Sequence, residues 1–346
     1  VNSLGHANPR LVKALYKQAK KLIPGGVMLF SKRPENHLPD KWPTYYKKAK
    51  GCSVWDMENK KKYRLKSIHR KILADTYTPV SVYLKIRDQF PHSLLLESSD
   101  YDARANNFSY VCCNPIASIS ISNGNIDYKY PDGLKYSRGI DLKDNVPNLI
   151  QSFSNQFKSE KHKFKFITIG LFGYLSHEAV SHFESISLNK NKSHFNTPDI
   201  YYAVYQNIIA ISLFNHEAHI FSNSLSGEDN LDEIEQIIKK DNIATYQFEK
   251  KGEKSSNLSD EEFLALVQKG KEHCFRGDVF QLVLSRRFSQ GFTGDEFNVY
   301  RTLRSINPSP YLFFFDYGDF KIFGLSLIHI SEPTRRTPIS YAVFCL

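Results

Sequence analysis

INPSPYLFFFDYGDFKIFG, residues Ile306–Gly324, is the stretch that decides the fold. Its apolar and polar residues alternate over Tyr311–Phe323 on either side of Gly318, a pattern typical of a β-hairpin. Pro308 and Pro310 precede the first strand, and because each proline ring fixes its own φ, they predict a rigid turn there. A hairpin this apolar needs neighbouring strands to cover it, so the stretch predicts a larger sheet.

The chain before the hairpin is also rich in strand patterns. We expect strands at Ser93–Glu97, Phe108–Cys113, Ile116–Ile121, Phe164–Leu175, Ile200–Leu213, Ala218–Ser222 and Val279–Phe288. Apolar residues at helical spacing predict helices at Pro79–Phe90, Leu231–Lys240, Asp260–Cys274 and Asp295–Ile306. Ser259 and Glu262 form a capping-box signature before the third of these helices. The polar stretch Asp241–Leu258 is expected to be a linker, and the whole pattern predicts an α+β fold.

The composition is that of a globular protein. The chain has 346 residues, of which 41% are hydrophobic and 24% charged, enough for two domains or one large one. No apolar run approaches the roughly 20 residues of a membrane span. The first residues, VNSLGHANPRLVKAL, lack the charged and then apolar plan of a signal peptide. We therefore predict a cytoplasmic protein with no membrane partner.

The net charge of +10 at pH 7 raises the question of a nucleic-acid partner. The excess of Lys and Arg falls within residues 1–71, and the remaining chain is slightly acidic. A basic surface is thus not a property of the whole chain, and we predict no nucleic-acid partner. The five cysteines are scattered, with no C-x-x-C pair and no histidine at metal-ligand spacing. No metal site is expected in this chain.

Glu97 and Ser98 follow the apolar run of LLLESSDY. A carboxylate and a hydroxyl at the end of a buried strand can hold the ammonium group of a ligand, because a buried acid needs a cationic or donor partner. The alternative is an ordinary strand end. In the same way Tyr311, after the prolines, can close a pocket, or the NPSP turn can merely stop a helix.

Gln281 lies in GDVFQLVLSRRF, on an expected strand whose neighbours are apolar. Its amide must be satisfied by the protein or by a ligand. Arg286 and Arg287 point to opposite faces of that strand, so one of them can pair with a carboxylate substrate. An edge strand with solvated arginines is the alternative.

Together these motifs resemble component I of anthranilate synthase, in the family of chorismate-utilising enzymes. The resemblance covers residues 65–324 and includes long strings at residues 71–117, GLFGYLSHEAV at 170–180 and PDIYYAVYQN at 198–207. It divides the chain into an N-terminal domain at 65–223, a helix and linker at 224–258, and the start of a chorismate-binding domain at 259–324.

The resemblance implies an enzyme of tryptophan biosynthesis that converts chorismate and ammonia into anthranilate and pyruvate with Mg²⁺. A glutamine amidotransferase, component II, supplies the ammonia, and L-tryptophan is the feedback inhibitor. The implied inhibitor site comprises Glu97, Ser98, Asn307, Pro310, Tyr311, Leu312 and Gly324. Gln281 is implied to neighbour the substrate, where relatives that add water to chorismate have a lysine base.

Three other functions stay open at this point. The related component I that forms para-aminobenzoate aminates chorismate at C4. A non-catalytic tryptophan-binding protein would use only the inhibitor site. An aminotransferase fragment is the third, because residues 1–64 resemble segments of class III pyridoxal-phosphate aminotransferases in reversed order.

Both ends of the chain depart from the family. Residues 1–64 are expected to be a foreign segment, and the tail at 325–346, LSLIHISEPTRRTPISYAVFCL, resembles a translated sequencing adaptor. The ligands for Mg²⁺ and the catalytic base are implied to lie beyond Gly324 in the family. We therefore expect an incomplete fold and an inactive chain.

Overall fold

The computed structural model describes residues 63–98, 107–141, 144–159, 164–184, 186, 197–307, 309, 311–325 and 344–345. The aminotransferase-like segment 1–64 lies outside the described residues except for Tyr63 and Arg64, which begin strand β1. Within the tail at 325–346, Leu325 ends β13 and residues 344–345 form a short strand. The assignment of these two segments stays a prediction.

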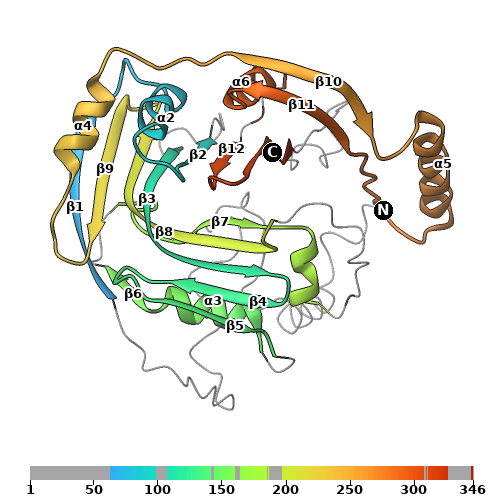
Figure 1. Cartoon of the computed structure of the whole chain (residues 1–346), viewed down its shortest axis with the longest axis horizontal. Helices are drawn as coiled ribbons and strands as arrows, with labels where there is room; N and C mark the ends of the chain where they lie inside the picture. Colours follow the sequence, from blue (N-terminus) through green and yellow to red (C-terminus); the bar gives the residue numbers. More distant parts are fainter. Residues whose placement is uncertain are drawn as a thin grey trace, which may run out of the picture.

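Most strands join one large, mainly antiparallel sheet (Figure 1), in the order β14-β13-β12-β2-β3-β8-β9-β1-β6. Off this path, β4 pairs with β3, β5 pairs with β4, and β7 pairs with β8. The strands of this sheet are β1 (Tyr63–Leu73), β2 (Leu94–Ser98), β3 (Ser109–Ser122), β4 (Asn125–Lys129), β5 (Lys135–Gly139), β6 (Phe157–Ser159), β7 (Phe172–Leu175), β8 (Ile200–Ser212), β9 (Glu217–Ser224), β12 (Tyr311–Asp316), β13 (Lys321–Leu325) and β14 (Phe344–Cys345). The helices are α2 (Pro79–Arg87), α3 (Val146–Ser154), α4 (Leu231–Lys239), α5 (Asp260–Arg276) and α6 (Phe297–Ile306), with the 3₁₀ helix η3 (Glu178–His182). The predicted α+β class is confirmed.

Helices α2 and α4 lie against the same part of the sheet. Helix α2 begins where the sequence predicts, because Thr78 and Ser81 form a capping box and Pro79 occupies the first turn. Its apolar side chains meet those of α4 over β3, β8 and β9 in one core cluster that includes Val82, Ile86, Ile209, Ile220, Ile234 and Ile238. Helix α3 covers a second cluster formed with β3 and β4 (Figure 1).

The hairpin predicted from the opening stretch is confirmed. Strands β12 and β13 pair antiparallel around Gly318, whose φ of 83° lies in the left-handed region that favours glycine. On its other edge β12 pairs with β2, in the register Phe314 to Leu95. Two segments that lie more than 200 positions apart in the sequence are therefore neighbours in the sheet.

The predicted strand at Val279–Phe288 is wrong. Only Phe288 is in a strand, β11 (Phe288–Gly294), which pairs with β10 (Phe248–Ser256) in a separate two-stranded sheet. A strand needs a partner, and none of the described segments pairs with residues 279–287. The linker predicted at Asp241–Leu258 is corrected as well, since most of its second half forms β10.

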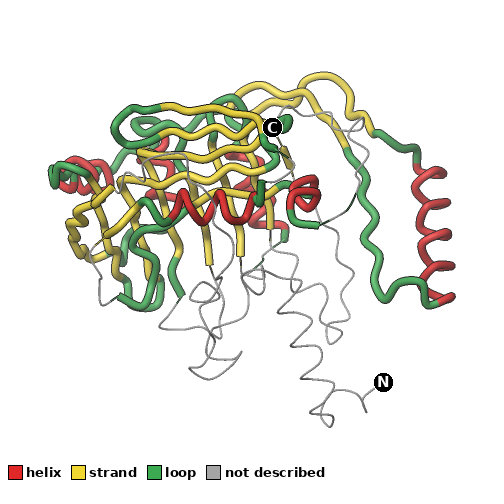
Figure 2. The backbone as a smooth tube through the Cα atoms, turned by 90° about the horizontal axis from the view of Figure 1, so that it is seen from below, coloured by secondary structure: helices red, strands yellow, loops and turns green. Residues whose placement is uncertain are grey.

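Helix α5 extends away from the main sheet (Figure 2). Its capping box at Ser259 and Glu262 is confirmed, and Gly277 ends the helix in the left-handed conformation. Of its residues only Gly270 is buried, so the predicted apolar face has no core to cover. Leu264, Leu266 and Phe275 of this helix are exposed.

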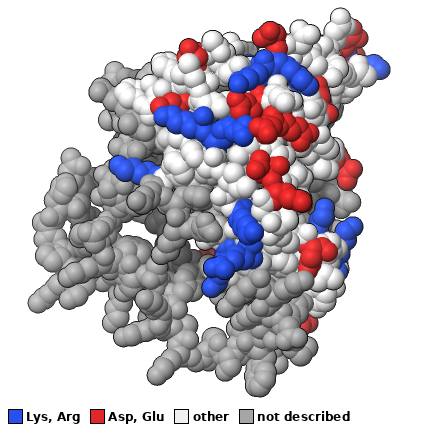
Figure 3. All heavy atoms as spheres, turned by 90° about the vertical axis from the view of Figure 1, so that its left-hand side faces the viewer, with Lys and Arg blue, Asp and Glu red and all other residues white. Residues whose placement is uncertain are grey.

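Lysine, arginine and carboxylate side chains are mixed on the face of the molecule that Figure 3 shows. Arg70 of β1 pairs with Asp232 and Glu235 of α4, and Lys239 pairs with Glu235. None of the described helices combines the length and the apolar character that a membrane crossing requires.

Candidate functional site

The two stretches predicted to share an inhibitor site lie on neighbouring strands. Glu97 and Ser98 end β2, and in the antiparallel register Ser98 stands opposite Tyr311 while Glu97 stands opposite Leu312. The backbone N–H of Ser98 donates to Oγ of Ser109 on β3 at 3.1 Å. The hairpin and β2 are thus direct neighbours, with Glu97 and Leu312 on one face of the sheet and Ser98 and Tyr311 on the other.

Glu97 is a buried carboxylate, with 5% of its side chain exposed. Its Oε2 accepts a hydrogen bond from the hydroxyl of Tyr300 at 2.5 Å and lies 3.0 Å from Nε of Arg304. Both partners come from α6. Because a buried carboxylate is costly without donors, these two residues explain how Glu97 is tolerated in the core.

The Tyr300 hydroxyl is held in its protonated, donating form. Burial raises the pKa of Tyr300 well above its usual value, and the negative charge of Glu97 raises it further. Its ring packs against the rings of Phe297, Phe314 and Phe323. Tyr300 is therefore a fixed hydrogen-bond donor to Glu97.

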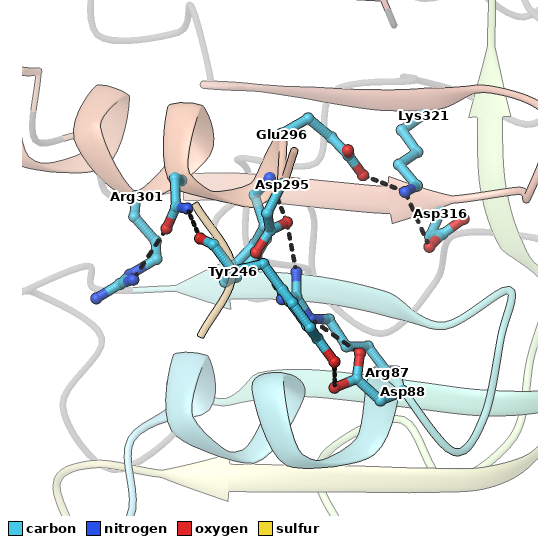
Figure 4. Close-up of polar contacts among 10 residues, drawn as sticks. Arg87, Asp88, Tyr246, Asp295, Glu296, Arg301, Asp316 and Lys321 are labelled. Carbon is cyan, nitrogen blue, oxygen red and sulfur yellow. Dashed lines mark hydrogen bonds and ion pairs between the residues drawn. The ribbon is translucent and has the colours of Figure 1, made fainter. Parts of the chain in front are cut away.

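The start of α6 is anchored by an ion pair (Figure 4). Both guanidinium Nη atoms of Arg87 donate to the carboxylate of Asp295, at 2.9 and 2.6 Å. Asp295 Oδ1 also accepts the backbone N–H of Phe297, the first residue of α6, at 3.0 Å. Next to it Lys321 of β13 lies between Glu296 and Asp316. These contacts fix α6 to α2 and to the hairpin.

A hollow of about 360 Å³ opens beside this anchor. It is lined by Tyr83, Arg87, Asp88, Tyr246, Gly294, Asp295, Glu296, Phe314, Asp316 and Lys321. Its two cations, Arg87 and Lys321, already face carboxylates. Nε of Arg87 and the hydroxyl of Tyr83 are buried without a hydrogen-bond partner among the described residues.

The other predicted inhibitor-site residues lie on the hairpin or just before it. Leu312 is buried, Tyr311 is half-buried, and Gly324 lies on β13 opposite Phe313. Asn307 is the C-cap of α6, where its backbone N–H donates to the carbonyl of Leu303 at 2.9 Å. Pro310 lies outside the described residues.

Gln281 does not join this site. It is exposed on the segment between α5 and β11, where the sequence predicted a strand with apolar neighbours. Arg286 of the same segment pairs with Asp260 at 2.5 Å, and the backbone N–H of Arg287 donates to the side chain of Asn257. Nothing in the described part of the chain assigns Gln281 to a substrate.

Sequence reasoning missed two pairs of site residues. Tyr300 and Arg304 are four positions apart on a helix that was predicted, so their shared face was available as a signal. Arg87 and Asp295 lie 208 positions apart in the sequence, so no local sequence pattern predicts their contact.

Magnesium has no evident site in the part of the chain described here. No group of three or more His, Cys, Asp or Glu side chains among those residues could hold a metal ion. We therefore assign no metal ligand and no metal-dependent step to the described residues.

Comparisons with known proteins match this chain to one enzyme family. The family model described as "chorismate binding enzyme" matches residues 95–327. Component 1 of anthranilate synthase from Neisseria gonorrhoeae is 32% identical over 272 residues, which are 74% of this chain and 54% of the relative. The Aquifex aeolicus protein of the same name is 26% identical over 80% of this chain and 58% of its own.

Two further matches also cover about half of the related protein. Aminodeoxychorismate synthase component 1 from Bacillus subtilis is 29% identical over 69% of this chain and 51% of its own length. The crystal structure of anthranilate synthase component I from Streptococcus pneumoniae aligns with a TM-score of 0.45 at 25% identity, covering 66% of this chain and 51% of that one. The chain spans about half the length of the curated relatives it matches.

Proposed function

The chain belongs to the family of chorismate binding enzymes, and we propose that within this family it is component I of an anthranilate synthase. The proposed reaction converts chorismate and ammonia into anthranilate and pyruvate with Mg²⁺ as the cofactor. A glutamine amidotransferase is the proposed partner that supplies ammonia. Relatives named anthranilate synthase component 1 support this proposal.

The described residues contribute a regulatory site for L-tryptophan. One observation supports this above all: buried Glu97 stands opposite Leu312, and neighbouring Ser98 stands opposite Tyr311, on adjacent strands. A zwitterionic amino acid needs a carboxylate for its ammonium group, and a buried carboxylate binds it more strongly than an exposed one. The apolar side chains of the hairpin then favour an aromatic ligand over a polar one.

Titration calorimetry of L-tryptophan into the 346-residue chain tests the site. We expect saturable binding, and we expect Glu97→Gln to weaken it at least about tenfold, because a charge-assisted hydrogen bond contributes about 1.5–3 kcal/mol. Asp127→Asn, on an exposed position of β4, is the matched control and should bind like the parent. A parent chain without binding, or a Glu97→Gln variant of equal affinity, would exclude this site.

A second candidate is the aminodeoxychorismate synthase activity, which the Bacillus subtilis relative favours. Chorismate, ammonium and Mg²⁺ are incubated with the chain, and the products are separated by chromatography. An amino group at C2 indicates the first function, and one at C4 indicates the second. The inactivity expected for this chain stays a prediction, and a reaction without either product would agree with it.

A further inference from the structure

The carboxylate of Glu97 already has a cationic partner when no ligand is bound. Nε of Arg304 lies 3.0 Å from Oε2 of Glu97, the oxygen that also accepts the Tyr300 hydroxyl. A ligand ammonium that reached this oxygen would meet a second cation within hydrogen-bond distance. Two cations at one carboxylate oxygen repel each other, so the ligand and Arg304 compete for Glu97.

The two partners of Glu97 differ in how readily they can move. Tyr300 is fully buried among aromatic rings, so it cannot leave without opening the core. Arg304 lies one turn further along α6, and 44% of its side chain is exposed. Among the described residues, Glu97 is the one ion-pair partner that the structure gives to Arg304. Its guanidinium can therefore swing into water while its place at Glu97 is taken.

We infer that Arg304 occupies the ammonium subsite of this ligand site and is displaced when an amino acid binds. This inference rests on the proposed L-tryptophan site. It makes Arg304 a residue that determines specificity, since only a ligand that brings its own cation can replace the arginine without leaving buried Glu97 unpaired. An interaction that exists only in the free protein lowers the apparent affinity, because the ligand must first disrupt it.

The opposite role for Arg304 is binding of the ligand carboxylate. In that role the arginine would stay in the complex, and its removal would weaken binding. The observed contact favours displacement, because the guanidinium is paired with Glu97 itself. The two roles predict opposite changes in affinity for the same substitution.

The experiment compares two ligands by calorimetry on the full chain at pH 7.5. L-Tryptophan carries an ammonium group, and indole-3-propionate has the same ring and carboxylate without it. We expect Arg304→Gln to bind L-tryptophan about fivefold more tightly, as removal of a competing half-exposed ion pair would allow. The affinity for indole-3-propionate should not increase. Arg304→Lys, which keeps a cation, should stay close to the parent chain.

Arg301 provides the matched control on the same helix. Its guanidinium donates to the side chain of Asn298 at 3.1 Å (Figure 4). Among the described residues, the ion pair of Glu97 is with Arg304 and not with Arg301. Arg301→Gln should leave both affinities unchanged. Arg304→Met, which keeps much of the aliphatic stem, is the second variant if Arg304→Gln folds poorly by circular dichroism, and it should also bind more tightly.

The outcomes separate the two proposals. If the parent chain does not bind L-tryptophan, the proposed site is contradicted, and so is the displacement of Arg304. Parent chain that binds, with Arg304→Gln binding equally or more weakly, overturns the displacement alone. If Arg304→Gln raised the affinity for both ligands equally, Arg304 would act as a steric obstacle. That result would also contradict the inference that Arg304 selects for ligands with an ammonium group.

Discussion

At the scale of single residues, the site depends on charges that are buried in pairs. Arg87 and Asp295 have 10% and 8% of their side chains exposed, so neither charge has much access to water. Their bidentate geometry offsets part of the desolvation cost. Asp295 also accepts the first backbone N–H of α6, and α6 carries both residues that contact Glu97.

We predict that Asp295→Asn destabilises the fold by about 3–5 kcal/mol, because it leaves the charge of Arg87 buried without its partner. The double variant Arg87→Met with Asp295→Asn should lose less than the sum of the single losses, since no charge is then left unpaired. Urea unfolding followed by circular dichroism measures each free energy. Asp232→Asn is the control and should change little, because the side chain of Asp232 is 81% exposed in its ion pair with Arg70. Additive losses at Arg87 and Asp295 would contradict the pairing.

At the scale of elements, strand β7 lies unusually close to β8. Gly173 stands opposite Tyr202, and a Cβ built on Gly173 would lie 1.9 Å from the carbonyl oxygen of Tyr201. No side chain fits at that distance without separating the two strands. Gly139 on β5 offers the contrast, since nothing lies within 4 Å of a Cβ there.

Gly173→Ala should therefore cost about 3 kcal/mol of the free energy of unfolding, the size of a strongly overpacked site. Gly139→Ala should be neutral or slightly stabilising, because alanine restricts the unfolded chain more than glycine does. The midpoints of urea unfolding compare the two variants directly. Equal midpoints would mean that β7 does not pack on β8 as the structure has it.

Elements whose signals are local were predictable from the sequence. The capping box at Ser259 and the glycine turn at Gly318, both predicted, each lie within a few residues of the structure they determine. The run Val279–Phe288 was mistaken for a strand because its apolar residues suggest one, whereas a strand exists only where a partner supplies hydrogen bonds. Glu97 was predicted as a site residue from its own short stretch of sequence. Its partners on α6 were not predicted, because Tyr300 lies 203 positions further along the chain.

At the scale of the whole molecule, the described chain has two parts of different packing. The main sheet and the helices packed on it bury clusters of apolar side chains. The unit of β10, α5 and β11 consists of a two-stranded sheet and a helix with a single buried residue (Figure 2). An isolated pair of strands is marginal in water, so this unit has little stability of its own.

Native-state hydrogen exchange followed by mass spectrometry compares helices from the two parts. Helix α4 buries Leu231, Ile234, Ile237 and Ile238 against the sheet, so its amides should exchange only when the main sheet unfolds. Helix α5 has comparable hydrogen bonds but almost no apolar burial, and we expect its amides to exchange through local opening at least about tenfold faster. Helix α4 is amphipathic and helix α5 has a capping box, so both segments favour a helix. A difference between their exchange rates therefore reports packing and not helix propensity. Equal protection of α4 and α5 would show that α5 is held by contacts with the rest of the chain and would contradict the two-part description.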